Sequence, residues 1–120
     1  MANIQDALQG VEKVSDPHFP HAPPDWSRET AAGIARQEQL TLGDDHWAVV
    51  RGLQEFFARH EYGVVNLREL YDALDEKFHY KGGMKYLYTL FPGGPIAQGC
   101  RLAGLKPPAG ATDLSFGSVA

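Results

Sequence analysis

Apolar residues recur at helical spacing along most of this 120-residue chain. The spacing predicts helices near residues 28–38, 44–60, 67–78 and 84–91, and a shorter one from 95 to 103. The residues expected to face the core are Ala31, Ile34, Ala35, Trp47, Val50, Leu53, Phe57, Leu67, Leu70, Tyr71, Leu74, Phe78, Met84, Leu87, Tyr88 and Phe91. A mainly α domain follows from this pattern.

Residues that favour helix starts stand before these stretches. Ser27 and Asn66 are N-cap residues, because a side-chain oxygen there can accept a free N–H of the first turn. Thr41 and Asp44 have the spacing of a capping box, although Asp replaces the preferred Glu or Gln. Pro95 suits the first position of the last helix.

Glycine and proline predict where regular structure ends. Gly63 offers a stop for the second helix, and Gly104 suits the left-handed position after the last one. The stretch "HFPHAPPDW" (18–26) has three prolines and cannot be the interior of a helix. Before it, "GVEKVSD" (10–16) could form a short strand, half of an edge hairpin.

The length supports one domain. We expect an N-terminal segment over residues 1–25, a helical domain over 26–106 and a flexible C-terminal arm over 107–120. The chain shows no apolar run of membrane-spanning length, no signal-peptide pattern and one cysteine. These features predict a cytoplasmic protein without membrane insertion.

Charge is distributed unevenly along the chain. The net charge is −4, but residues 1–78 carry 14 acidic and 7 basic side chains, whereas residues 79–120 have a balance of +3. The single cysteine, Cys100, lies in the basic part. Nearby positive charge favours a thiolate and would make the thiol reactive. The alternative is a small buried apolar residue, because Ile96, Cys100 and Ala103 share one helix face.

Motifs for several chemistries are missing from the sequence. It contains no Gly-rich phosphate loop, no zinc-type cysteine pairs and no nucleophile elbow. His18 and His21 are interpreted as loop histidines, so we expect neither a metal nor a cofactor. The "HYKGG" turn between two helices could form a helix-turn-helix pair, but its second helix offers only Lys85 for phosphate contacts, with Lys81 in the turn.

Two stretches of the sequence resemble a known family. "KGGMKYLYTLFPGGPIAQGCRLAGLKPPAGA" and "PDWSRETAAGIARQEQLTLGDDHWAVVRGLQEFF" are similar to the DsrC/TusE family, and the likeness covers about residues 25–111. That family includes the gamma subunit of dissimilatory sulfite reductase and the sulfur relay protein of tRNA thiolation. The resemblance implies a compact helical domain with a helix-turn-helix-like arrangement, an N-terminal β-hairpin and a mobile C-terminal arm.

The resemblance also implies a sulfur-carrying cysteine on the arm, with a second cysteine on the last helix in sulfite-reductase-type members. Cys100 matches the helix cysteine, and the arm position eleven residues later is Ala111. An alanine methyl group forms neither a persulfide nor a disulfide. A dithiol mechanism is therefore excluded, and Cys100 is the only thiol that could carry sulfur.

Three functions remain open. The first is sulfur trafficking through docking on proteins of a sulfur relay or sulfite reductase system. Cys100 would then be a partly accessible persulfide site, and Lys85, Arg101 and Lys106 would stabilise its thiolate or bind anionic sulfur species. Such a protein is at most a sulfurtransferase-type carrier rather than a stand-alone enzyme. The second is a regulatory homologue that binds the same partners without carrying sulfur, and the third is DNA binding.

Overall fold

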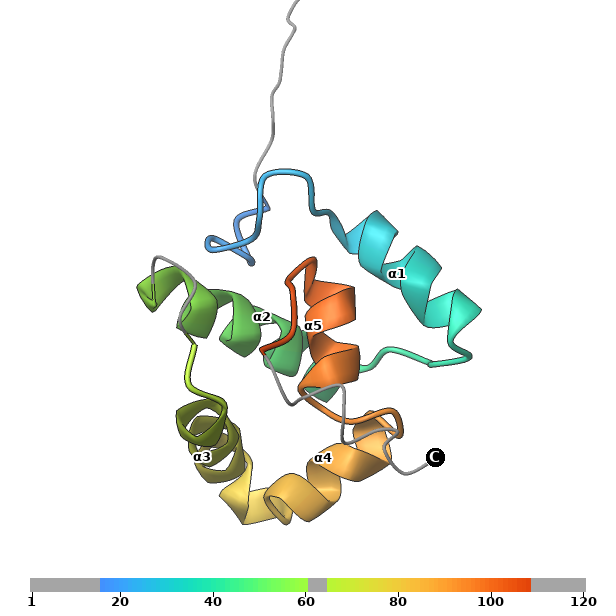
Figure 1. The fold of residues 1–120 in the computed structure, drawn as a ribbon. Coiled ribbons are helices and arrows are strands. Elements are labelled where there is room, and N and C mark those ends of the chain that lie inside the picture. The colour runs from blue at the N-terminus through green and yellow to red at the C-terminus, as the bar shows by residue number, and fades with distance from the viewer. Residues whose placement is uncertain (1–15, 61–64, 109–120) are drawn as a thin grey trace, which may run out of the picture.

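Five α-helices and one 3₁₀ turn form the regular structure of residues 16–60 and 65–108, which the computed structural model describes (Figure 1). They are α1 (Arg28–Gln37), α2 (Asp44–Arg59), α3 (Leu67–Lys77), the turn η2 (His79–Lys81), α4 (Met84–Leu90) and α5 (Ala97–Ala103). The mainly α fold and all five predicted helices are confirmed. The described residues contain no strand.

Some predictions concern residues that the structure does not describe. The strand predicted for residues 10–16 and the arm predicted for residues 107–120 lie almost entirely outside the described ranges. The same holds for Gly63, and α2 ends at Arg59 before that glycine. Residues 18–26 form turns without a helix, as the prolines predict.

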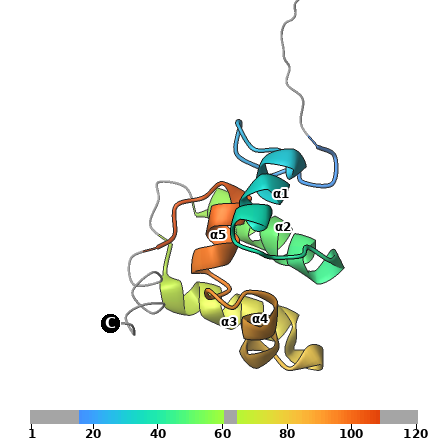
Figure 2. The ribbon, with the colours of Figure 1, turned by 90° about the vertical axis from the view of Figure 1, so that its right-hand side faces the viewer.

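The short helix α5 occupies the centre of the fold (Figures 1 and 2). It packs against α1 and α2, and every residue of α5 except Arg101 is buried. Gly99 allows this close approach, because a Cβ added there would lie 2.8 Å from Cδ1 of Leu53 on α2. A larger residue at this position would force the buried Leu53 side chain or one of the two helices to shift.

Two of the three predicted N-terminal caps are confirmed. Ser27 Oγ accepts the N–H of Thr30 at 3.0 Å, and Asn66 Oδ1 accepts the N–H of Glu69 at 3.0 Å. The capping box of Thr41 and Asp44 is wrong, because α2 begins at Asp44 with Gly43 as its N-cap.

A histidine performs the capping role at the start of α2. The Gly43 N–H donates to Nδ1 of His46 at 3.0 Å, and Nε2 of the same ring lies 2.9 Å from the Leu90 carbonyl oxygen. The neutral ring that satisfies both contacts carries its hydrogen on Nε2. His46 therefore caps α2 and also joins it to the end of α4.

Both ends of α5 follow the sequence prediction. The Gln98 N–H donates to the Gly94 carbonyl at 2.8 Å, so helical hydrogen bonding begins around Pro95 although α5 itself starts at Ala97. Gly104 adopts the left-handed conformation with φ 78° and ψ 24°. The Leu105 N–H donates to the Cys100 carbonyl and the Gly104 N–H to that of Arg101, which is the Schellman pattern of helix termination.

The core includes a residue that the periodic pattern does not reveal. Phe19, in the proline-rich stretch, is only 2% exposed. Its ring lies 4.8 Å from that of Trp26 and 5.8 Å from that of Trp47, measured between centroids. The Trp26 Nε1–H donates to the Leu102 carbonyl oxygen at 2.7 Å. The irregular segment is thereby fixed over the C-terminal end of α5.

Most predicted core positions are buried or half-buried, with one exception. Tyr88 is 40% exposed, so its assignment to the core is wrong. The helix α4 has only seven residues and turns Leu87, together with the following Phe91, toward the core. The Tyr88 hydroxyl lies outside, 2.9 Å from that of Tyr71.

Candidate functional site around Cys100

The cysteine lies in the middle of α5 and is completely buried, with an exposed fraction of 0%. The helix face that it shares with Ile96 and Ala103 is buried as well, as the spacing predicts. The expected partial accessibility of Cys100 is therefore wrong. The reason is that α1 and α2 both pack on α5, which leaves no open side at this position.

Burial also decides the ionisation of the thiol. It raises the pKa of Cys100 from 9.0 to about 12, and the charge of Arg101 opposes this with a smaller effect. The thiolate is the form that attacks sulfur electrophiles, and a buried thiol with a high pKa is inert. In this conformation Cys100 is a protonated core residue at neutral pH.

Arg101 points away from Cys100 and contacts Glu38 at the end of α1. Its Nε donates to Oε2 of Glu38 at 2.8 Å, and its Nη2 donates to Oε1 at 2.9 Å. The hydrogen bond from Arg101 is the largest cause that lowers the pKa of Glu38. The positive charge predicted to act on the thiol is thus mostly balanced by a carboxylate.

A buried amide extends this contact into the core. Gln98 is 5% exposed, donates through Nε2 to Glu38 Oε1 at 2.8 Å, and accepts the Gly93 N–H through Oε1 at 3.0 Å. It joins α1, α5 and the turn before α5. Neither Gln98 nor Glu38 was predicted as a site residue. The available signal was an uncharged polar side chain in a short helix whose one other polar residue is Arg101.

The other two predicted cations, Lys85 on α4 and Lys106 after α5, are both exposed. Neither forms an ion pair with a carboxylate of residues 16–60 or 65–108. The charge that lowers the pKa of Cys100 comes from Arg101. The structure therefore does not gather Lys85, Arg101 and Lys106 around the thiol.

A second buried amide holds the end of α5. Gln54 on α2 is fully buried, and its Nε2 donates to the Ala103 carbonyl oxygen at 3.1 Å. Its Oε1 has no hydrogen-bond partner within the described part of the chain. Gln98 therefore holds the first turn of the helix that carries Cys100, whereas Gln54 and Arg101 hold its last turn.

The first turn of α2 faces the turn η2. Lys81 Nζ donates to Oδ2 of Asp45 at 2.8 Å, and the Tyr86 hydroxyl donates to the same oxygen. These two bonds lower the pKa of Asp45. Lys81, the turn cation of the predicted helix-turn-helix pair, is therefore engaged within the protein.

Two further properties concern the described residues alone. Within residues 16–60 and 65–108, no three His, Cys, Asp or Glu side chains lie close enough together to hold a metal ion. In the same ranges, no helix has the length and apolarity that a membrane crossing requires.

These features define a small, mainly α domain that is built around a central helix with one buried cysteine. Residues 11–111 match the family model described as DsrC like protein, and the chain belongs to this family. The NMR structure of Allochromatium vinosum DsrC superimposes with a TM-score of 0.61 at 39% sequence identity, covering 72% of this chain and 77% of that one. The mainly α, DsrC-like fold predicted from the family resemblance is thus confirmed.

Relatives of known sequence agree with this family. The sulfurtransferase TusE of Photorhabdus laumondii is 39% identical over 85 residues, which cover 70% of this chain and 76% of the relative. The sulfurtransferase TusE of Yersinia pseudotuberculosis is 40% identical over 85 residues, covering 70% of this chain and 78% of the relative.

Proposed function

We propose that this protein serves in a sulfur-relay system by docking on partner proteins, and that it does not carry sulfur on Cys100 while α5 is in place. The family membership and the TusE relatives support the sulfur-relay setting. The observation that carries the second part is the complete burial of Cys100, whose pKa of about 12 keeps it protonated.

The chemistry of sulfur transfer explains why burial matters. A carrier thiolate attacks the outer sulfur of a donor persulfide, a new S–S bond forms, and the donor leaves as a thiolate. The attacking sulfur must be ionised and must reach the donor along the S–S axis. Cys100 meets neither condition in the folded state. The chain has no second cysteine, so an intramolecular disulfide cannot release the sulfur either.

Transfer through Cys100 after local opening of α5 is the second candidate. One observation favours it, because α5 is only seven residues long and an ion pair at the protein surface helps to hold it. Local opening costs less free energy than global unfolding, and it would expose the thiol transiently. Cys100 as a persulfide site remains a prediction under this candidate alone.

The charge distribution disfavours DNA binding. The helix α4, which would be the recognition helix, carries Lys85 as its cation, and Lys81 is paired with Asp45. The preceding helix α3 carries four acidic side chains against Arg68 and Lys77, and this negative balance would repel phosphates. Protein partners fit this surface better than nucleic acid does. The cytoplasmic location expected from the sequence remains a prediction.

The test exposes the purified chain to glutathione persulfide and follows its intact mass. We expect no gain of a sulfur atom on the native protein over hours, and a gain on protein unfolded in guanidinium chloride. Cys100→Ala is the control and should gain nothing in either condition. Iodoacetamide labelling under the same two conditions measures access to the thiol without sulfur chemistry.

The outcomes separate the candidates. Rapid sulfur gain by the native protein would overturn the docking proposal in favour of a carrier. Slow sulfur gain would indicate transfer through local opening if folding slows sulfur gain and iodoacetamide labelling by the same factor. For each reaction, this factor is the rate in the unfolded chain divided by the rate in the native protein. A partner complex that keeps its affinity when Cys100 is replaced by Ala would support docking without sulfur transfer.

A further inference from the structure

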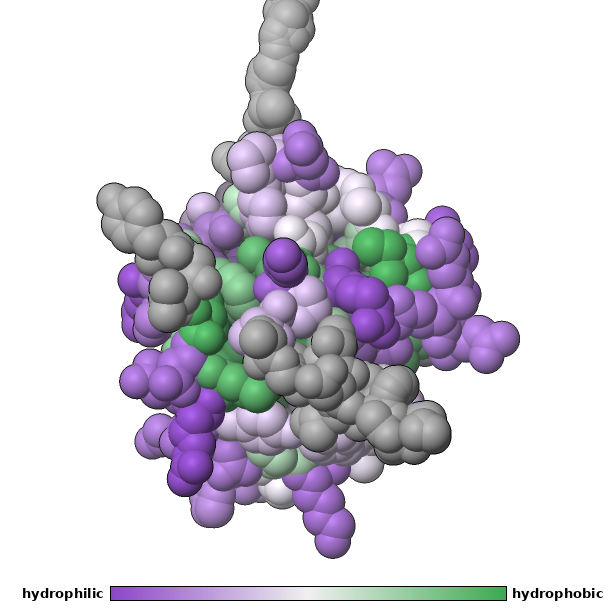
Figure 3. All heavy atoms as spheres, viewed as in Figure 1, coloured by the Kyte–Doolittle hydropathy of each residue, from purple (hydrophilic) through white to green (hydrophobic). Residues whose placement is uncertain are grey.

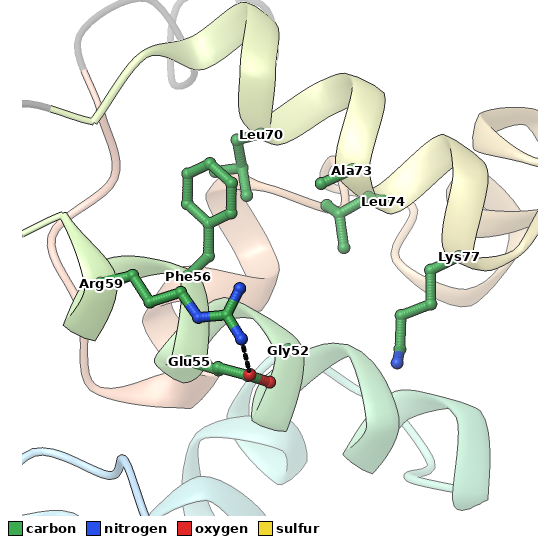
Figure 4. Close-up of a pocket in the computed structure, with 8 residues that line it drawn as sticks. All are labelled: Gly52, Glu55, Phe56, Arg59, Leu70, Ala73, Leu74 and Lys77. Atoms are coloured by element: carbon green, nitrogen blue, oxygen red, sulfur yellow. Dashed lines mark hydrogen bonds and ion pairs between the residues drawn. The ribbon is translucent and has the colours of Figure 1, made fainter.

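A shallow apolar groove lies between α2 and α3 (Figure 4). Phe56 on α2 and Leu70 on α3 lie at one end, Leu74 lines the middle, and the volume is about 160 Å³. Ala73 contributes an exposed methyl group to the rim. The space-filling view shows hydrophobic side chains at the surface where α2 faces α3 (Figure 3).

Arg59 and Lys77 against Glu55 give the residues that line this groove a positive balance. Arg59 is 71% exposed and pairs with Glu55 at 2.6 Å on the α2 side. Lys77 lines the other end and makes no ion pair with a carboxylate of residues 16–60 or 65–108. An occupant that combines apolar side chains with one negative charge would match the groove.

The sequence supplies such a segment in "TDLSFG", residues 112–117. In an extended chain Leu114 and Phe116 point to the same side, and Ser115 points to the other. Asp113 directly precedes this pair and is the one acidic residue after Glu76. The segment therefore offers two apolar anchors at strand spacing, next to one carboxylate.

The position where the described chain ends allows this contact. In both ribbon views, the red-orange end of the described chain lies near the N-terminal end of α3 (Figures 1 and 2). Leu70 is in the first turn of α3, so one end of the groove is nearby. The six residues from 108 to 114 can span roughly 20 Å when extended. Intramolecular docking of this kind also has a high effective concentration.

We propose that Leu114 and Phe116 occupy the α2–α3 groove of their own chain, with Asp113 directed toward Arg59 or Lys77. The contact covers the apolar surface in the free protein. A partner that binds at this groove must then displace residues 112–117. This proposal does not depend on sulfur chemistry and stands whether or not Cys100 carries sulfur.

The test uses nuclear Overhauser effects in the full chain with labelled methyl groups and phenylalanine rings. We expect cross-peaks between the Phe116 ring and the methyl groups of Ala73 and Leu70. The double substitution Leu114→Asp and Phe116→Asp should remove these cross-peaks and shift the Ala73, Leu70 and Leu74 methyl signals. Ser115→Asp adds a charge within the same segment and should leave both unchanged.

Changes on the groove side complete the test. Ala73→Glu places a bulky negative side chain on the exposed rim and should release Phe116, whereas Ala58→Glu, on an exposed position of α2 outside the groove, should not. Absence of the cross-peaks in the unmodified chain would overturn the proposal. So would cross-peaks that appear only at high protein concentration, because a second copy would then be the occupant.

Discussion

Arg101 and Glu38 lie 63 residues apart in the sequence, and their side chains meet through two hydrogen bonds of 2.8 and 2.9 Å. The contact ties the exposed side of α5 to the C-terminal end of α1. The residue next to Cys100 therefore stabilises the helix that buries the thiol, rather than the thiolate. Arg101 is better described as a positioning residue for α5.

The first prediction concerns the strength of this contact. Arg101→Gln and Glu38→Gln each remove one charge, and both should lower the free energy of unfolding. The coupling energy from the double-mutant cycle should be about 0.5–1 kcal/mol, because the pair is partly exposed to solvent. Urea unfolding of the four proteins measures it.

The same variants test how Cys100 becomes accessible. If opening of α5 controls access, iodoacetamide should label Cys100 several times faster in Arg101→Gln than in the unmodified protein. Arg59→Gln removes a comparable exposed ion pair on α2, with Glu55, and serves as the matched control. Equal labelling rates in all three proteins would mean that the Arg101–Glu38 contact does not control exposure of the thiol.

The second prediction concerns Trp26, which donates its indole N–H to the Leu102 carbonyl oxygen. Trp26→Phe keeps an aromatic ring but loses this donor, so we expect the free energy of unfolding to fall by about 1–3 kcal/mol. Trp47→Phe is the control, because no residue of the described ranges accepts a hydrogen bond from the Trp47 indole N–H. A smaller loss for Trp26→Phe than for Trp47→Phe would contradict the assigned role.

The sequence predicted the local features of this fold well. The structure confirms the predicted helix-terminating or capping roles of Ser27, Asn66 and Gly104. Each role depends only on contacts within one turn of the chain. The shared face of Ile96 and Cys100 follows equally from helix periodicity. Such predictions need no knowledge of the partner helices.

The candidate site depends on contacts between distant parts of the chain, which periodicity does not reveal. Whether Cys100 is exposed depends on α1 and α2 both covering α5, and no local pattern encodes that arrangement. Arg101 is next to Cys100 in the sequence, but it pairs with Glu38 at the end of α1. The sequence neighbourhood alone therefore suggested a thiolate-stabilising charge that the structure does not direct at Cys100. Phe19 was missed because a proline-rich turn has no helical or strand period.

The third prediction compares two helical glycines. Gly99→Ala would place a Cβ 2.8 Å from Leu53 Cδ1, in the packed contact between α5 and α2. We expect a loss of about 1–3 kcal/mol in the free energy of unfolding, because the buried Leu53 side chain or one of the helices must shift. Native labelling of Cys100 should also become faster.

Gly33 on α1 is the matched control. A Cβ there meets only the flexible end of Arg36, at 3.8 Å. Gly33→Ala should therefore raise the free energy of unfolding by about 0.5–1 kcal/mol through its better helix propensity. Thermal or urea unfolding measures both variants. If the free energy of unfolding changes in the same direction in Gly99→Ala and Gly33→Ala, close packing does not distinguish the two positions.

The fourth prediction follows from the pKa of Cys100, which burial raises from 9.0 in the free side chain to about 12 in the folded protein. Below pH 9 the thiol is protonated in both states, and it contributes no pH dependence. Between about pH 9 and 12 the unfolded chain loses this proton and the folded chain keeps it. The free energy of unfolding must then fall as pH rises, by at most about 1.4 kcal/mol per pH unit for one proton.

Cys100→Ala isolates this contribution. The smaller side chain changes stability by an amount that does not depend on pH, so the two unfolding curves should be parallel below pH 9 and converge or cross above it. Tyr71 has a pKa raised to about 12, mainly by burial, and adds a loss of the same sign in both proteins at higher pH. Urea unfolding at pH 8 to 10.5 therefore measures the thiol before tyrosine dominates. Curves that stay parallel throughout would show that Cys100 ionises equally in both states, which would contradict its burial and restore it as a reactive thiol.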